Sequence, residues 1–270
     1  METIERIDEW RESYLRWKRI NELRNDEVGE HYPWVENTHA PFRPMGRALP
    51  MLNLALITSA GAYIDGSEPF EVTNPGGDAS FREIPTLIEA EDLRWAARGY
   101  DSAAAVEKDM NSQVPLERLF EFEGNGIIGQ LNPVFWSFCG FIPSAARFVD
   151  NALPQLVERV KRYSAQAALL IPASRLCHQS MGLAARALEA AGITTIVLAV
   201  DKEAIERVRP PRAVYYTGEF GSVAGLPNFP EHQRRILDET LRLLEPWDQV
   251  DVRKLTVALQ TTVENQRGEK

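Results

Sequence analysis

Apolar and amphipathic segments alternate along the second half of the chain. Short apolar runs without a polar side predict strands that are buried on both faces of a sheet. Segments with apolar residues at steps of three and four predict helices that cover such a sheet. Alternating strands and helices are typical of an α/β fold with a doubly wound, flavodoxin-like and mainly parallel sheet. The predicted strands cover 52–57, 167–172, 193–200 and 212–216, and the predicted helices cover 115–123, 151–163, 178–191, 201–208 and 231–244.

The N-terminal part of the chain has a different pattern. Apolar residues at helical spacing, placed between charges, predict an amphipathic helix from Ile4 to Val28. Prolines and aromatic residues recur over 30–50, which predicts an extended connection without a regular element. The expected organisation is an N-terminal helix and extended arm over 1–48, an α/β domain over 49–260 and a polar tail over 261–270.

Composition and charge narrow the classes of function. With 270 residues, 44% of them hydrophobic, the chain can form a large buried core. The net charge of −9 argues against nucleic acid or an anionic membrane as the main partner. No apolar run approaches the roughly 18 residues of a membrane span. The two cysteines form no CxxC pair and the four histidines lack metal-binding spacing, so we expect a cytoplasmic protein without a disulfide, metal or cofactor.

Cys177 is the first candidate for chemistry. It follows the apolar run 167–172 and precedes an alanine-rich helical segment, which places it at the carboxyl edge of the predicted sheet. Open α/β sheets bind ligands at this edge, and a helix N-terminus stabilises a thiolate. His178 follows directly, either as a general base for the thiol or as a residue that bonds the backbone at the helix start. The alternative for Cys177 is a small buried hydrophobic residue.

Polar residues near this turn are candidates for a substrate site. Ser174 precedes Cys177 and is interpreted either as a capping hydroxyl or as part of the pocket. Arg175 is suited to hold a carboxylate with two hydrogen bonds, and its alternative is a solvated turn cation. Ser59 belongs to a run of small residues after the first strand, where a ligand can approach the backbone closely.

A second polar group lies in the loop before the middle of the chain. Asp78, Ser80 and Arg82 place an acid, a hydroxyl and a guanidinium within one short loop. They predict either a structural network or a site that orients an amino acid or carboxylate substrate. Cys139 lies among aromatic residues and is expected in the core. The glycine-rich loop 218–227 is interpreted either as a flexible flap or as close backbone packing over the sheet edge.

Five segments, in order, resemble the selenoprotein B subunit of the glycine, sarcosine, betaine and D-proline reductases and its selenium-free relatives. Together they span much of the predicted α/β domain. They are Ile57–Gly61, Asn74–Pro85, Ser137–Pro143, Leu176–Ser180 and Arg209–Ala213.

The resemblance implies a reductive attack on a carbon–nitrogen bond next to a carboxylate. In the family the attacking group is a selenocysteine or cysteine three residues before the motif's cysteine, and here that position is Ser174. The resemblance also implies a partner subunit that carries a pyruvoyl group. Family members have histidines near a Tyr-Asp pair, whereas this chain has none around Tyr100 and Asp101.

Three functions follow from these observations. The first is a reductase-like enzyme on a small amino-acid-like or carboxylate substrate, with Cys177 as nucleophile or thiol relay and a thiol reductant or partner subunit supplying the second sulfur. The alternative is a non-catalytic or divergent subunit that docks a partner chain. The third is a small-ligand-binding protein in which the thiol is idle. A homo-oligomer is compatible with all three.

Overall fold

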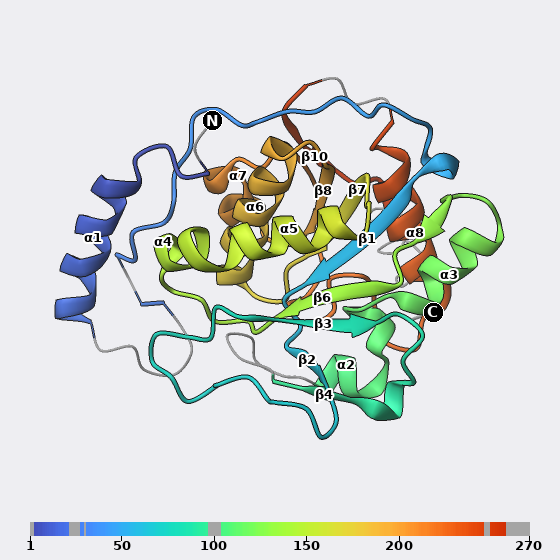
Figure 1. Cartoon of the computed structure of the whole chain (residues 1–270), viewed down its shortest axis with the longest axis horizontal. Coiled ribbons are helices and arrows are strands. Elements are labelled where there is room, and N and C mark those ends of the chain that lie inside the picture. The colour runs from blue at the N-terminus through green and yellow to red at the C-terminus, as the bar shows by residue number, and fades with distance from the viewer. Residues whose placement is uncertain (1–2, 22–27, 30, 97–103, 246–248, 258–270) are drawn as a thin grey trace, which may run out of the picture.

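A single twisted sheet forms the centre of the molecule (Figure 1). The computed structural model describes residues 3–21, 28–29, 31–96, 104–245 and 249–257. Within this part the sheet strands are β1 (Asn53–Thr58), β3 (Phe81–Pro85), β5 (Gln130–Leu131), β6 (Val134–Phe138), β7 (Ala167–Ile171), β8 (Thr194–Ala199), β9 (Arg212–Tyr215) and β10 (Asp251–Lys254).

The strand order is β10-β9-β8-β7-β1-β6-β3, and β5 pairs with β1 beside this path. All neighbours run parallel except β3, which is antiparallel to β6 with Phe81 opposite Phe138. A second, two-stranded sheet is formed by β2 (Ala62–Ile64) and β4 (Leu93–Trp95). The chain starts the large sheet in the middle and extends it in both directions, which is the doubly wound arrangement.

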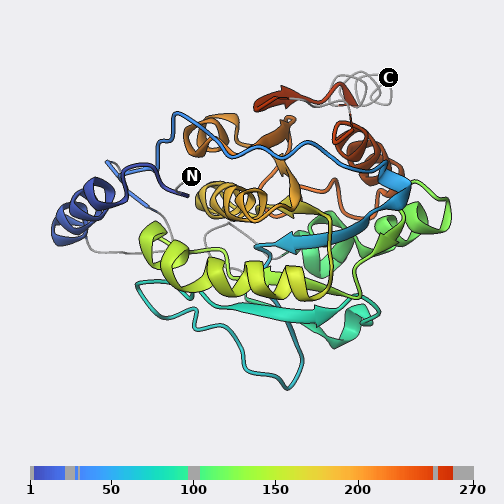
Figure 2. The ribbon, with the colours of Figure 1, turned by 45° about the horizontal axis from the view of Figure 1, so that its top comes forward.

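Helices cover both faces of the sheet (Figures 1 and 2). One apolar core lies between the sheet and α5, α6 and α7, and the other lies between the sheet and α3 and α8. The helices are α1 (Ile7–Ile20), α2 (Ala104–Lys108), α3 (Leu116–Gly124), α4 (Ala145–Arg147), α5 (Leu153–Arg162), α6 (Arg175–Ala190), α7 (Lys202–Val208) and α8 (Pro230–Arg242), with short 3₁₀ turns at Leu49–Met51, Ala90–Asp92 and Met110–Ser112 and a π turn at Phe148–Ala152.

The N-terminal helix and arm pack onto the first of these cores. The helix α1 buries an aromatic side that includes Trp10 and Trp17, and the Trp10 indole N–H donates to the carbonyl of Pro33. The arm has extended backbone, and its Val35 N–H donates to the side chain of Gln179 on α6 at 2.8 Å. The helix was predicted from Ile4 to Val28, whereas α1 begins at Ile7, because the preceding residues turn toward the arm, where the Glu5 N–H bonds to Asn37. It ends at Ile20, and residues 22–27 of the prediction lie outside the described residues.

The α/β class and the mainly parallel sheet are confirmed. Sequence periodicity located β1, β7, β8 and β9 within one or two residues, because each is a short apolar run. The helix α6 begins at Arg175 rather than at residue 178, since the Ser174 side chain caps the N–H of Cys177. Strands β3 and β6 were not predicted. The polar tail over 261–270 lies outside the described residues, and the domain division stays a prediction.

None of the helices in the described part of the chain combines the length and the apolar character that a membrane crossing requires.

Candidate functional site

The carboxyl ends of β1, β7 and β6 meet at one edge of the sheet and place their following loops together. Ser59 follows β1, and its hydroxyl accepts a hydrogen bond from Ala173 N at 2.8 Å in the loop after β7. Gly140 follows β6, and its carbonyl lies 2.9 Å from the sulfur of Cys177. Neighbouring parallel strands end at the same edge of the sheet, so the loops that follow them lie side by side.

The sulfur of Cys177 is enclosed by polar groups. The Ser174 hydroxyl donates to the Cys177 sulfur at 3.0 Å and accepts from the Cys177 N–H at 3.3 Å. The thiol in turn donates to the carbonyl of Gly140. Both side chains are buried. The Ser174 hydroxyl therefore both caps α6 and contacts the Cys177 thiol.

Burial controls the acidity of both thiols. It raises the pKa of Cys177, and hydrogen bonds from Ser174 and Ser59 oppose this only in part. It also raises the pKa of Cys139 to about 12, and the nearby Cys177 adds to the rise. In this conformation both thiols are protonated at neutral pH, because a desolvated thiolate is unfavourable.

Native-state alkylation should follow from this burial. We expect neither cysteine to react with iodoacetamide at pH 8 within the time that labels a free thiol, and both to react after denaturation, because reagent and thiolate are both excluded from the folded core. Intact-mass spectrometry at intervals, with glutathione as the reference thiol, measures this. Rapid single labelling at Cys177 in the native protein would contradict it and would indicate an open, ionised site.

The imidazole of His178 bonds only to the backbone. Its Nδ1 lies 2.7 Å from the carbonyl oxygen of Ser174, and its Nε2 accepts from the N–H groups of Val200 and Asp201 at 3.1 and 3.2 Å. Since a carbonyl only accepts and an amide N–H only donates, the ring is neutral with the proton on Nδ1. The ring ties the start of α6 to the end of β8, and neither nitrogen contacts Cys177.

His178 should make folding stability depend on pH. Burial lowers the pKa of His178 to about 4, whereas an unfolded histidine titrates near pH 6.5. Between these values the unfolded chain binds the proton and the folded chain does not. The contribution of neutral His178 to the free energy of unfolding is therefore complete above pH 6.5. It falls by roughly 3 kcal/mol as the pH is lowered toward 4. Urea unfolding of the wild type and His178→Gln at several pH values measures the difference between the two curves.

The comparison of the wild type with His178→Gln isolates the contribution of His178, because the other titratable groups are the same in both proteins. The buried His232 titrates in the same direction in every variant and cancels in the comparison. Parallel curves for the wild type and His178→Gln between pH 7 and pH 4.5 would show that His178 makes no such contribution.

Arg175 points away from the thiol and toward α7. Its guanidinium forms ion pairs of 3.2 Å with Asp201 and Glu203, and it lies over the ring of Trp34. About half of its side chain is exposed to solvent. Its charge is therefore already paired at the surface, on the side of α6 that faces α7.

Asp78, Ser80 and Arg82 bond to one another and to their own loop. The Asp78 carboxylate accepts from the Ser80 N–H and hydroxyl, and Arg82 donates to Ser80 and to the carbonyls of Glu68 and Pro69. Although burial alone would raise the pKa of Asp78, the hydrogen bonds from Ser80 and the loop backbone hold it below its usual value. The structure thus connects the three side chains to one another, and a role in substrate binding stays a prediction.

The loop of Asp78 packs against the segment that follows Cys139. Gly77 has φ +71°, and a Cβ there would overlap the carbonyl oxygen of Phe141, so the close approach requires glycine. The Asp78 carboxylate is near enough to contribute to the raised pKa of Cys139. Within the described chain, none of the hydrogen bonds that Asp78, Ser80 and Arg82 form reaches Cys177.

A cavity of about 550 Å³ lies between α2 and the loop that follows β9. The ring of Phe220 separates it from His178, with ring centres 5.9 Å apart, and the Gly221 N–H bonds to the carbonyl of Ala173 at 2.8 Å. Lys108 lines this cavity and supplies a cation to it. The lining comprises Ala104, Ala105, Lys108, Gly218, Glu219, Phe220, Ser222 and Pro227.

Sequence reasoning missed Gln113, a buried residue at the same edge. Its amide donates to the carbonyl of Ile171 at 3.3 Å and accepts from the Val223 N–H at 3.0 Å, which fastens the loop after β9 to the end of β7. No local pattern marked it, because Asn111, Ser112 and Gln113 form a polar run that is typical of a loop. Lys108 was also missed, since nothing local indicates a cavity. Among the described residues, no cluster of His, Cys, Asp or Glu could hold a metal ion.

The fold and this edge define a doubly wound α/β protein with a capped, buried thiol at the carboxyl ends of its central strands. The chain belongs to the glycine, sarcosine and D-proline reductase family. It is 31% identical over 201 residues to D-proline reductase subunit gamma of Acetoanaerobium sticklandii, which covers 74% of this chain and 81% of that protein. This finding confirms the resemblance that the five sequence segments indicated.

A second relative is the sarcosine reductase complex component B subunit beta of Peptoclostridium acidaminophilum. It is 25% identical over 186 residues, and the match covers 67% of this chain and 41% of that protein. No family model matches the chain, and no solved structure matches it. Both relatives are subunits of reductases, so the family comparison places this chain among oxidoreductase components.

Proposed function

We propose that this chain is a subunit of a reductase that cleaves a carbon–nitrogen or similar bond in a small amino-acid-like or carboxylate substrate, with Cys177 as the reacting thiol. The 3.0 Å contact between the Ser174 hydroxyl and the Cys177 sulfur carries the proposal. It places the position that holds selenocysteine or cysteine in the family directly against the thiol, at the sheet edge where α/β proteins bind ligands.

The cavity beside Phe220 supports a binding role for this edge. Its volume of about 550 Å³ is within the range of small-molecule sites. Lys108 is suited to hold the carboxylate of a substrate, because its side chain forms no ion pair within the described chain. Access from this cavity to Cys177 requires the segment with Phe220 and Gly221 to move, since that segment covers His178 and bonds to the loop after β7.

Two thiols supply the electrons in this proposal. As the carbon–nitrogen bond breaks, the nitrogen and the α-carbon each gain a hydrogen, and the Cys177 sulfur forms a disulfide with the sulfur of an external dithiol. The second thiol of that reductant then releases Cys177 as a free thiol. Ser174 cannot form a bond to sulfur, so its part is to hold the Cys177 thiol, and His178 positions the start of α6.

Product formation from D-proline and sarcosine, the substrates in the names of the relatives, tests the proposal. The chain, isolated from its native source together with any partner subunit and supplied with excess dithiothreitol, should release an open-chain amino acid from D-proline or methylamine from sarcosine, measured by mass spectrometry. Cys177→Ala should abolish the product, whereas Cys139→Ala is the matched thiol control and should retain it. Equal product from Cys177→Ala and the wild type would refute the role of Cys177.

A second candidate is a non-catalytic subunit, and the serine at position 174 favours it. A hydroxyl is a poor nucleophile and takes no part in thiol exchange, so this chain lacks the family's first redox group. This candidate predicts a stoichiometric complex with another reductase subunit whose activity is unaffected by Cys177→Ala. A chain that remains alone after native purification would contradict it.

A further inference from the structure

The outer edge of β3 is free of any strand within the described part of the chain, where β3 ends the sheet. Phe138 directs its carbonyl toward the β1 side, because it accepts from Gly61 N at 2.8 Å. Backbone groups alternate along a strand, so Ser137 bonds on the other side, to β3, opposite Arg82. The N–H and C=O of Glu83 therefore point outward, away from the sheet.

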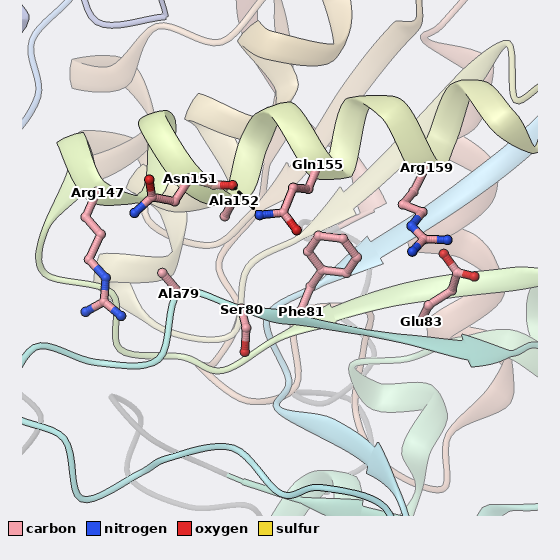
Figure 3. Close-up of a pocket in the computed structure, with 9 residues that line it drawn as sticks. All are labelled: Ala79, Ser80, Phe81, Glu83, Arg147, Asn151, Ala152, Gln155 and Arg159. Carbon is pink, nitrogen blue, oxygen red and sulfur yellow. Dashed lines mark hydrogen bonds between the residues drawn. The ribbon is translucent and has the colours of Figure 1, made fainter.

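A groove of about 410 Å³ runs between this strand and the helix above it (Figure 3). Its helical wall is formed by four side chains spaced four residues apart, which lie on one face of the helical segment. Its other wall is formed by side chains at the start of β3, and Phe81 extends toward Gln155. The helical wall consists of Arg147, Asn151, Gln155 and Arg159, all of them exposed.

The two arginines form no ion pair within the described chain. The guanidinium of Arg147 donates to the carbonyl of Gly77 at 3.5 Å. Arg159 lies near Glu83, but the carboxylate of Glu83 already accepts hydrogen bonds from Trp136 and Tyr163. Two arginines and the one carboxylate of Glu83 line the groove, so its charged side chains leave a small positive excess on a chain whose net charge is −9, which favours acidic groups there.

The dimensions of the groove suit an extended chain rather than a small anion. Arg147 and Arg159 are twelve positions apart, which is about 18 Å along a helix. The strand Phe81–Pro85 has a length of about 17 Å. One anion cannot contact both arginines, whereas a peptide paired with β3 passes both of them.

We propose that the edge of β3 and this groove bind an extended acidic segment of another subunit, which adds a strand to the sheet. Main-chain hydrogen bonds to Glu83 hold the segment, and its acidic side chains contact Arg147 and Arg159. This is the β-augmentation mode of peptide recognition. The proposal does not depend on chemistry at Cys177, because the groove is formed by β3 with the two residues before it, α4, the π turn and α5.

A labelled peptide of about eight residues, roughly 26 Å when extended, tests the site with the full chain. Glutamate alternating with valine gives the peptide the required charge and strand propensity. Fluorescence anisotropy should show binding that weakens at least tenfold in Arg147→Glu/Arg159→Glu. Arg162→Glu is the matched control on α5, because Arg162 is paired with Glu158, and it should change the affinity by less than twofold.

Hydrogen exchange distinguishes strand addition from simple charge attraction. The outward amide of Glu83 should exchange more slowly when the peptide is bound, whereas the amide of Arg82 is protected with or without it. Undiminished binding to the double variant, equal binding of a lysine–valine peptide, or unprotected Glu83 would overturn the proposal. So would sedimentation that shows a dimer of this chain lost in the double variant, because a second copy would then be the occupant.

Discussion

Ser174→Cys is expected to create a thiol pair that forms an intramolecular disulfide with Cys177. The Ser174 oxygen and the Cys177 sulfur lie 3.0 Å apart, and a disulfide needs about 2.05 Å between sulfurs, so a small side-chain adjustment suffices. Both groups lie at the N-terminus of α6, and Ser174 lies before its regular turns as the N-cap residue. The variant should lose two free thiols on mild oxidation and regain them with dithiothreitol.

Ser180→Cys is the matched control for this prediction. It also places a thiol three residues from Cys177, but within the regular helix α6, where side chains at this spacing are about 5–6 Å apart and exceed disulfide reach. Thiol titration and a mass loss of two hydrogens should therefore occur only in Ser174→Cys. In its reduced form, Ser174→Cys should have a free energy of unfolding about 1 kcal/mol lower than that of the wild type, because cysteine replaces a capping hydroxyl.

If Ser174→Cys keeps all of its free thiols after treatment with a mild oxidant, the result would contradict the geometry of this turn. A disulfide that forms and is then reduced during turnover of D-proline or sarcosine would connect the engineered pair to the proposed reaction. Disulfide formation without turnover would confirm the turn geometry and favour the non-catalytic subunit. The structural result and the functional result are thus separable.

Glu189→Ala should destabilise the protein by about 3–5 kcal/mol, since it leaves a buried guanidinium without its counter-charge. Glu189 and Arg212 form an ion pair of 2.6 Å in which both side chains are fully buried. The same carboxylate accepts from the Arg43 N–H at 2.6 Å and from Thr195 N at 2.8 Å. One side chain therefore joins the arm, α6, β8 and β9, and its loss affects all four. Urea denaturation with a linear extrapolation measures the change.

Glu158→Ala removes an exposed carboxylate that pairs with Arg162, and it should cost less than about 1 kcal/mol. The double variant Glu189→Leu/Arg212→Leu should recover much of the loss, because apolar side chains need no counter-charge. Equal effects of Glu189→Ala and Glu158→Ala would show that the buried pair does not stabilise the fold. A double variant as unstable as the single one would instead assign the loss to the bonds with Arg43 and Thr195.

The sequence alone located much of the fold and the candidate thiol. Strand β7 is an apolar run and α6 an alanine-rich amphipathic segment, so local pattern placed Cys177 at the carboxyl edge of the sheet. Strand β3 was not predicted, because Arg82 and Glu83 make this segment as polar as a loop. Its strand character comes from pairing with β6, which lies far away in the chain.

What the sequence determined is therefore the α/β class, the order of its central elements and the family, because apolar periodicity and short motifs are local properties. Only the tertiary structure decided the partners of the polar atoms. It turned both nitrogens of His178 toward the backbone, paired Arg175 with α7, and enclosed Cys177 among Ser174, Ser59 and Gly140. These contacts join strands and loops that are distant in sequence. Their geometry depends on the packing of the whole sheet, which no local pattern contains.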